Sequence, residues 1–183
     1  MVRGQKNPAH VGLPSRLKAA RRLRDIKHRP LASAADIAPS TVGAIEKGQQ
    51  IPTVGKIAQL ASALRVSAAW LGFGIGDMLT EDAIATCDGM GARLQAVRIE
   101  RAVTKAELGR LAGLTAPSIT QIEKGGQSGV EVIEAIAQVL GLSPGWLAFG
   151  IGPQAPCAPR RGRPRRSHPP RSADSSLASS ACT

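Results

Sequence analysis

Residues 31–48 read LASAADIAPSTVGAIEKG, and residues 108–125, 77 positions later, read LGRLAGLTAPSITQIEKG. In each stretch, apolar residues recur three or four positions apart within two short segments, which indicates two helices that each bury one stripe. Asp36 and Gly113 fall between the segments, where a tight turn needs a residue that tolerates positive φ. Both stretches end in Glu-Lys-Gly, a charged last turn followed by a glycine stop. Each stretch therefore predicts two short helices that meet at a tight turn.

The similarity extends well beyond these two stretches. Residues 16–48 align with residues 93–125 without a gap. The second copy then lacks one residue, and residues 57–76 align with residues 133–152 at an offset of 76. The closing segments read WLGFGIG at 70–76 and WLAFGIG at 146–152. Self-similarity at a fixed period over about 60 residues indicates two structural units. Each unit contains the helix-turn-helix pattern of two short helices joined by a short turn.

Each copy begins with Arg-Leu-x-x-x-Arg, continues to Ile-Glu-Lys-Gly and ends in an apolar segment. In these features the chain resembles two tandem domains of the lambda-repressor-like (Cro/CI, XRE) helix-turn-helix family. The resemblance implies an all-α fold with five short helices in each domain. It also implies that the glutamate of each Ile-Glu-Lys-Gly ending has a structural role.

The repeat and the composition divide the chain into five parts. We expect a flexible N-terminal arm at 1–14, a first domain at 15–76, a linker at 77–90, a second domain at 91–152 and a disordered basic tail at 153–183. Good N-cap residues stand where several helices should begin. These are Ser15 and Ser67 in the first copy and Thr104, Thr115, Ser128 and Ser143 in the second, while Pro39 and Pro144 suit the first helical position.

The charge of the chain is strongly basic and unevenly distributed. Its 24 basic and 13 acidic residues give a formal net charge of +11, which points to a polyanion such as nucleic acid. Residues 15–79 carry +6 and the tail +5, whereas residues 80–152 carry −2. Affinity for phosphates is therefore expected from the first domain and the tail.

Several classes of function find no support in the sequence. Cys87, Cys157 and Cys182 are scattered without a CxxC motif, which suggests a reducing cytoplasm and no metal site. No nucleophile–base pair is recognisable, so we expect no catalytic residues, no enzyme activity and no cofactor. The longest uncharged apolar run, at 66–76, is too short to span a bilayer. The expected location is the cytoplasm, in association with the nucleoid.

The resemblance implies that the second helix of each motif enters the major groove and that its first helix braces on the DNA backbone. The base-reading candidates on the second helices are Ser40, Thr41, Ser118, Thr120 and Gln121. Gln121 stands out because glutamine can pair with adenine through two hydrogen bonds. The phosphate-contact candidates are Arg16, Arg21, His28, Arg29, Lys47, Lys105 and Lys124. His28 and Lys105 stand where the family usually has glutamine.

The tail contains Arg161, Gly162, Arg163 and Pro164, a core that resembles an AT-hook. In that motif the glycine lets an extended backbone enter a narrow A·T minor groove, and the arginines reach along it. A basic tail that adds only non-specific affinity is the alternative interpretation.

These features favour a sequence-specific, repressor-like transcriptional regulator that binds double-stranded DNA without catalysis. An alternative is an interaction protein in which one domain binds DNA and the other mediates dimerisation or binds a protein partner. A third is an architectural binder of A·T-rich DNA driven by the tail. Fourteen linker residues reach at most about 45–50 Å, and successive half-sites lie ~34 Å apart. The sequence leaves open whether one chain spans two half-sites or a homodimer uses one domain from each chain.

Overall fold

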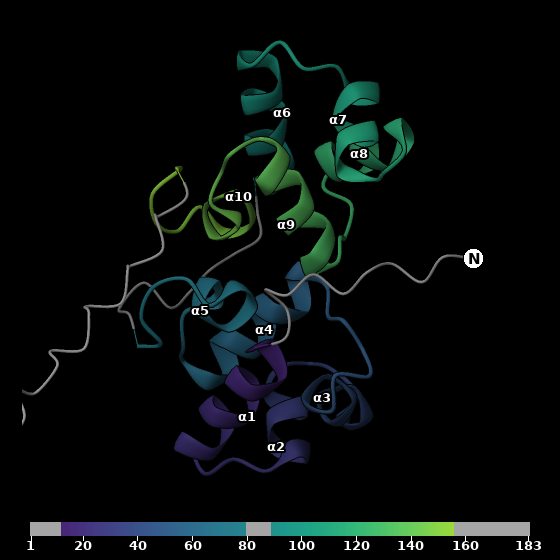
Figure 1. Ribbon diagram of the computed structural model, residues 1–183. Helices are drawn as coiled ribbons and strands as arrows, with labels where there is room; N and C mark the ends of the chain where they lie inside the picture. The colour runs from purple at the N-terminus through teal and green to yellow at the C-terminus, as the bar shows by residue number, and fades with distance from the viewer. Residues whose placement is uncertain (1–11, 80–88, 156–183) are drawn as a thin grey trace, which may run out of the picture.

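The computed structural model describes residues 12–79 and 89–155, and this part of the chain forms ten helices and no strand. In the first half these are α1 (Leu13–Leu23), α2 (His28–Ala34), α3 (Pro39–Glu46), α4 (Val54–Leu64) and α5 (Ala68–Phe73). The second half contains α6 (Met90–Glu100), α7 (Lys105–Ala112), α8 (Ala116–Glu123), α9 (Val130–Val139) and α10 (Pro144–Phe149). The expected all-α fold with five helices in each repeat is confirmed (Figure 1).

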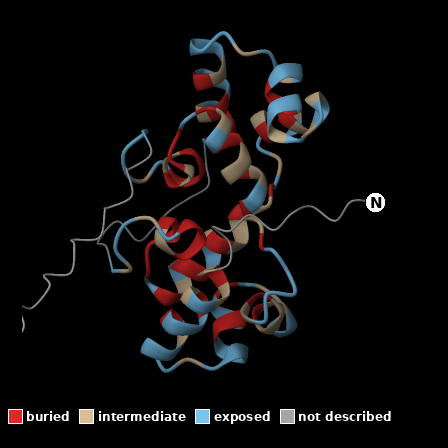
Figure 2. Ribbon diagram, viewed as in Figure 1, coloured by how far each residue is buried: buried red, intermediate tan, exposed pale blue. Residues whose placement is uncertain are grey.

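The two halves pack their helices in the same way. α1 contacts α3 and α5 as α6 contacts α8 and α10, and α2 contacts α3 and α4 as α7 contacts α8 and α9. Equivalent apolar residues fill the two cores, and Figure 2 shows them as the buried interior of each domain. Core residues of the first domain include Leu17, Leu31, Ile45 and Leu60, and their equivalents in the second are Leu94, Leu108, Ile122 and Ile136.

The turns of the two helix-turn-helix motifs have the backbone that the sequence predicts. Asp36 has φ of 51° between α2 and α3, and Gly113 has φ of 69° between α7 and α8. Glycine adopts this left-handed conformation freely, and aspartate is one of the few other residues that visit it routinely. The turn in the first domain therefore stores more backbone strain than the turn in the second.

Local start signals predict some helix boundaries and miss others. Ser67, Thr104 and Thr115 each cap a helix by accepting a hydrogen bond from a backbone N–H three residues later. The expected cap at Ser15 is wrong: α1 begins at Leu13 after Gly12, with Pro14 in its first turn. Proline fixes φ near the helical value, so helix can start two residues early. The first domain therefore includes part of the expected arm.

The expected cap at Ser128 is also wrong, because α9 begins at Val130 and its N-cap is Gly129. The carbonyl of Ser128 accepts a hydrogen bond from Val54 N–H of the first domain, at 2.9 Å. This contact holds residue 128 in an extended segment and delays the start of the helix. Ser143 is the N-cap of α10, as expected, but its side chain makes no capping hydrogen bond.

The two domains pack directly on each other through α5 and α10 (Figure 1). A short antiparallel bridge between Thr53 and Gly129 adds a second contact. Arg16 of α1 and Glu134 of α9 lie near each other across this contact: burial lowers the pKa of Arg16 and raises the pKa of Glu134, and the charge of each partly offsets the shift of the other. The tandem repeat thus forms one body in which the domains meet face to face.

Three parts of the expected domain organisation lie largely or wholly outside the described residues: the arm at 1–11, residues 80–88 of the linker, and the tail from 156 onward. In what is described, no helix combines the length and apolar character needed to cross a membrane.

Candidate nucleic-acid interface

The second helix of each motif, α3 or α8, is called here the recognition helix. Both lie along the same edge of the molecule in Figure 1, at opposite ends of the two-domain body. Each buries one stripe in its own core, formed by Val42 and Ile45 in α3. The opposite face is open: Ser40 near the start of α3 and Gln121 in α8 are both exposed. Each helix therefore presents a face that a DNA groove could receive.

The base-reading candidates differ in how free their side chains are. Ser40 is exposed and Thr41 is half-buried. Ser118 and Thr120 are half-buried and engaged within α8: the Ser118 hydroxyl lies 2.8 Å from that of Thr115, and the Thr120 hydroxyl donates to a carbonyl of the same helix at 3.1 Å. Gln121 is exposed, so its amide is the most available hydrogen-bonding group among the candidates.

The chain passes close to Gln121 at a glycine that is not among the site candidates. A Cβ on Gly126 would lie 2.7 Å from Cγ and 2.8 Å from the backbone oxygen of Gln121, so this close approach to the end of α8 requires glycine. The Gly-Gly pair at 125–126 was the available signal, since the first repeat has Gly-Gln at 48–49.

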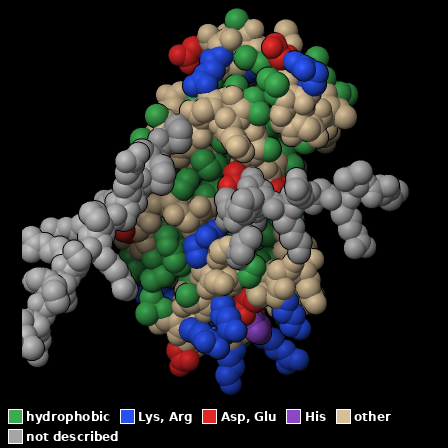
Figure 3. All heavy atoms as spheres, viewed as in Figure 1, with side chains coloured by type: hydrophobic (Ala, Val, Ile, Leu, Met, Phe, Trp, Pro, Cys, Tyr) green, Lys and Arg blue, Asp and Glu red, His purple; other side chains and the backbone are tan. Residues whose placement is uncertain are grey.

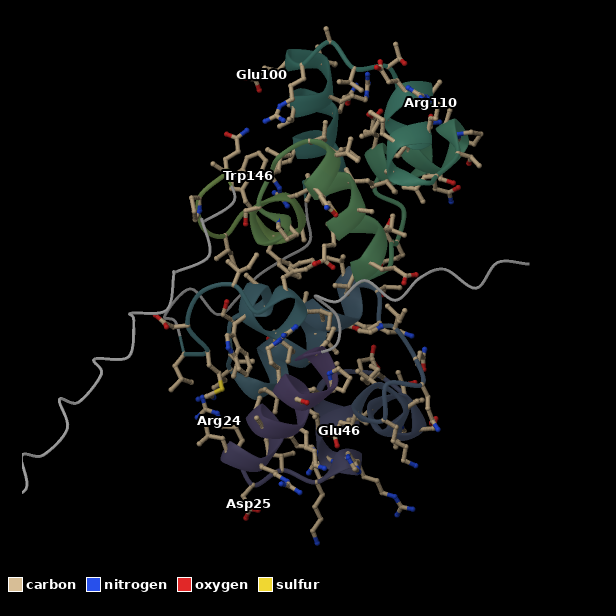
Figure 4. All side chains as sticks on the ribbon, in the orientation of Figure 1. Arg24, Asp25, Glu46, Glu100, Arg110 and Trp146 are labelled. Carbon is tan, nitrogen blue, oxygen red and sulfur yellow. The ribbon has the colours of Figure 1, made fainter. Side chains whose placement is uncertain are left out.

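A buried carboxylate anchors each recognition helix to the two helices before it. Glu46, at the end of α3, has a side chain only 8% exposed. It accepts hydrogen bonds from Arg21 Nε of α1 at 2.6 Å and Arg21 Nη2 at 3.2 Å, and its Oε2 lies 2.9 Å from His28 Nε2 of α2. Figure 4 shows Glu46 within the first domain, whereas Asp25 and Glu100 lie at the outer tips of the two domains.

The second domain repeats this arrangement at the equivalent positions. Glu123 is 4% exposed, and it pairs with Arg98 Nε at 2.6 Å and with Lys105 Nζ at 3.0 Å. Burial alone would raise the pKa of both glutamates, but the hydrogen bonds and charges of their partners outweigh it. The pKa of Glu46 and that of Glu123 therefore lie below the ordinary value for glutamate.

A second arginine in each domain fastens the first helix to the last one. Arg16 donates from Nε and Nη2 to the carbonyls of Leu71 and Gly72, at 3.0 and 2.9 Å. Arg93 makes the same two bonds to the carbonyls at the end of α10. These bonds satisfy carbonyls that a helix C-terminus otherwise leaves without partners.

The structure therefore separates the phosphate-contact candidates into three groups. The guanidinium groups of Arg16 and Arg21 are hydrogen-bonded inside the first domain, to the carbonyl of Leu71 and to Glu46. His28 and Lys105 are 46% and 38% exposed and lie on the rim of the buried carboxylates. The remaining candidates, Arg29, Lys47 and Lys124, are exposed and form no ion pair with these carboxylates in the described part of the chain.

Further exposed basic residues extend the candidate surface of the first domain. Figure 3 shows a concentration of Lys and Arg side chains at the end of the molecule formed by α1 and α2. Lys18, Arg22 and Lys27 are exposed. The sequence places Lys18 and Arg22 on the outer face of the first helix, for which phosphate contact and simple solvation are both open, and Lys27 just before the second helix.

Comparisons with known families match the two halves separately. A family described as "Helix-turn-helix" matches residues 17–71, and a family described as "Helix-turn-helix domain" matches residues 90–147. The chain carries two helix-turn-helix domains in tandem. Because different family descriptions match the two helix-turn-helix domains, the repeats have diverged while keeping one fold.

A curated protein supports the same assignment. The chain is 35% identical over 75 residues to the "HTH-type transcriptional regulator PrtR" of Pseudomonas aeruginosa, a match that covers 41% of the chain and 29% of that protein. The chain thus spans less than a third of the length of the relative it matches. No solved structure matches the chain significantly.

The AT-hook-like core at Arg161, Gly162, Arg163 and Pro164 lies outside the described residues. Its role therefore stays a prediction from the sequence. Where the described chain ends, Gln154 still belongs to the fold: its carbonyl accepts a hydrogen bond from Ser143 N–H at 2.8 Å, as Met78 accepts one from Ser67 N–H in the first domain.

Proposed function

We propose that the chain is a non-catalytic transcriptional regulator that binds specific double-stranded DNA and acts as a repressor by occupying an operator. The observation that carries the proposal is the open face of both recognition helices in two tandem helix-turn-helix domains. If those faces were buried against the rest of the chain, no groove could admit either helix. The basic surface of the first domain and the overall charge of +11 support a polyanionic ligand. Such a regulator would work in the cytoplasm, at the nucleoid.

We further propose that the two domains divide the work. The described part of the first domain carries ten basic and four acidic residues, whereas residues 89–155 carry six and five. On α3, Gly43 and Ala44 offer no hydrogen bond to a base, whereas α8 presents the exposed amide of Gln121. The first domain would therefore contribute most of the phosphate contacts, and the second would read bases.

The decisive experiment compares Gln121→Ala with the full chain on sites selected from random duplex DNA. A bidentate glutamine–adenine pair is worth about 1–3 kcal/mol of discrimination, or roughly 5- to 150-fold in affinity. We expect the variant to lose preference at one or two adenines while the salt slope of binding is unchanged. The matched control is Gln138→Ala, an exposed glutamine on α9 that lies outside the recognition helix. An intact base preference in the Gln121 variant would refute the division of work.

Salt dependence tests DNA binding as such. Neutralising Z phosphates gives a slope of about −0.9Z in a plot of log affinity against log salt. We expect Lys47→Ala and Arg29→Ala each to reduce that slope by about one contact across all sequences. A flat slope for the full chain would refute every DNA-binding proposal.

The small net charge of the second domain favours one alternative, an interaction protein in which that domain serves dimerisation or a protein partner. It predicts that Ser118→Ala combined with Gln121→Ala leaves both sequence preference and affinity unchanged. The tail is tested by truncation after residue 155, which keeps the carbonyl of Gln154 that bonds to Ser143. A repressor so truncated retains its preference and loses general affinity, whereas an architectural binder loses most of its binding.

A further inference from the structure

The bridge between the two domains joins residues that are equivalent in the repeat. Thr53 and Gly129 are the N-caps of the equivalent helices α4 and α9, 76 positions apart, and they pair as an isolated antiparallel bridge. Val54 N–H donates a hydrogen bond to the carbonyl of Ser128 at 2.9 Å, and Val130 N–H donates one to the carbonyl of Pro52 at 3.3 Å. The two hydrogen bonds are thus equivalents of each other, and the bridge is symmetric about its centre.

The contact between α5 and α10 repeats this self-pairing twice. The rings of Phe73 and Phe149, again 76 positions apart, have centroids separated by 6.1 Å at an interplanar angle of 51°. Ala69 faces Gly145, its equivalent, so closely that a Cβ on the glycine would lie 3.0 Å from the Cβ of the alanine. Three pairs from three places along the chain therefore meet their own counterparts.

Self-pairing of this kind identifies the geometry of the contact. In a two-fold symmetric interface the same patch is used on both sides, and a residue on the axis meets its own copy. In a head-to-tail contact the two patches differ, so equivalent residues do not meet. The two domains are therefore related by a pseudo-two-fold axis that passes between Thr53 and Gly129, between Ala69 and Gly145, and between the two phenylalanines.

Given the proposed DNA-binding function, on which this inference rests, we infer that one chain binds one duplex site made of two dissimilar half-sites in inverted orientation. The axis that relates the domains also relates α3 to α8, so the two recognition helices meet the duplex with opposite polarity. Their sequences, PSTVGAIE and APSITQIE, differ at the outward positions, so the half-sites differ too. The pairing of the two domains exists before DNA binds, and no second chain is needed.

The covalent link makes a small contact sufficient for this pairing. Two binding modules held in one chain by a short linker can face each other at an effective concentration on the order of 1 mM. At that concentration, an interface with an intrinsic Kd of about 10 µM would be closed about 99% of the time. The same faces of α5 and α10 are then occupied within the chain and not available to a second copy.

Altered DNA sites test the inference with the full-length protein. After selection of a preferred duplex, one half-site is reversed in place, and separately 10 base pairs are inserted between the halves. We expect sedimentation to show one chain per duplex and both changes to reduce affinity at least about tenfold, to that of an isolated half-site. Two chains per duplex, a preference for direct repeats, or full affinity after the insertion would overturn the inference. If no sequence is enriched and the salt slope is flat, the proposed function itself fails.

A disulfide tests the domain pairing without DNA. Thr53 and Gly129 form a non-hydrogen-bonded antiparallel pair, for which Cα atoms lie about 4.5 Å apart, within the range that a disulfide spans. Gly129 has an ordinary negative φ and room for a side chain. Thr53→Cys with Gly129→Cys, in a chain whose three native cysteines are serine, should form an intrachain disulfide in the monomer at every protein concentration.

The matched control pairs Gly129→Cys with Gln59→Cys, an exposed position on α4 too far along the helix to bridge. The control should not cross-link, and the cross-linked test protein should keep its affinity for the selected site. Interchain disulfides, or loss of DNA binding on cross-linking, would show that the paired arrangement is not the one that binds DNA.

Discussion

Replacing the buried carboxylate of the second domain with an amide, Glu123→Gln, should destabilise the protein in a pH-dependent way. Glu123 is 4% exposed and holds α8 to α6 and α7 through Arg98 and Lys105. Glutamine has the same shape but no charge, so the guanidinium of Arg98, itself 12% exposed, is left without its counter-ion.

The size of the effect follows from burial. Removing one partner of a buried ion pair costs about 3–5 kcal/mol. Glutamine still offers one oxygen to Arg98, and Lys105 is 38% exposed and can be solvated by water. We therefore expect a loss at or just below the lower end of this range, about 2–3 kcal/mol in the free energy of unfolding. For a chain of 183 residues this corresponds to a decrease in Tm of about 5–10 °C.

The sign of the pH dependence follows from the depressed pKa of Glu123. A carboxyl whose pKa is lower in the folded state stabilises the fold above its ordinary pKa, and this contribution is lost as pH falls through the folded value. The difference between wild type and Glu123→Gln should therefore be full at pH 7 and shrink steadily below about pH 4.5.

Urea unfolding followed by circular dichroism at pH 7, 5 and 3 measures this difference. Glu131→Gln, an exposed glutamate on α9, is the matched control and should stay within about 0.5 kcal/mol of wild type. A loss of less than 0.5 kcal/mol for Glu123→Gln at pH 7, or a loss that is the same at pH 3, would refute the structural role of the pair.

Three further predictions concern other positions. Burial raises the pKa of Glu134, so its charged form destabilises the fold at pH 7. Glu134→Gln should therefore increase the free energy of unfolding at pH 7 by less than about 1 kcal/mol, with a slightly higher Tm. The gain should vanish below about pH 4.5, which thermal unfolding at both pH values checks. A Cβ at position 43 would meet open space, so Gly43→Ala should stabilise α3 by about 0.5–1 kcal/mol. A Cβ at position 91 would overlap the last carbonyl of α8, so Gly91→Ala should cost about 1–3 kcal/mol in the free energy of unfolding, measured in the same urea titration. Thr115→Ala removes a cap and should cost ~1 kcal/mol, and Ala38→Thr at the uncapped start of α3 should gain a similar amount; a null result for both in chemical unfolding would contradict the capping argument.

The sequence predicts the architecture well because the information is local and occurs twice. Helical periodicity, positive φ at Asp36 and Gly113, and caps at Thr104 and Thr115 depend on residues within one or two turns. The missed start at Ser128 has a non-local cause, since its carbonyl bonds to the other domain. No pattern within a single helix could have revealed that partner.

The candidate site was less predictable than the fold. Periodicity distinguishes the buried stripe of a helix from its outer face, but it does not say where a long side chain ends. Arg16 and Arg21 stand on the first helix beside exposed arginines, yet one reaches the carbonyls of α5 and the other reaches Glu46. Their repetition as Arg93 and Arg98, in the domain with little net charge, was the signal that packing and not DNA holds them in place.

The joining of two matched domains in one polypeptide has a consequence for how a DNA target can change over time. In a regulator built from two identical subunits, each inherited alteration of the reading surface is duplicated, and both arms of the target must change together. In the arrangement proposed above, an alteration at Ser40 would leave the proposed reading surface around Gln121 as it was. The two arms of such a target would then be free to change independently, one base at a time, and an imperfect palindrome would be the natural end point.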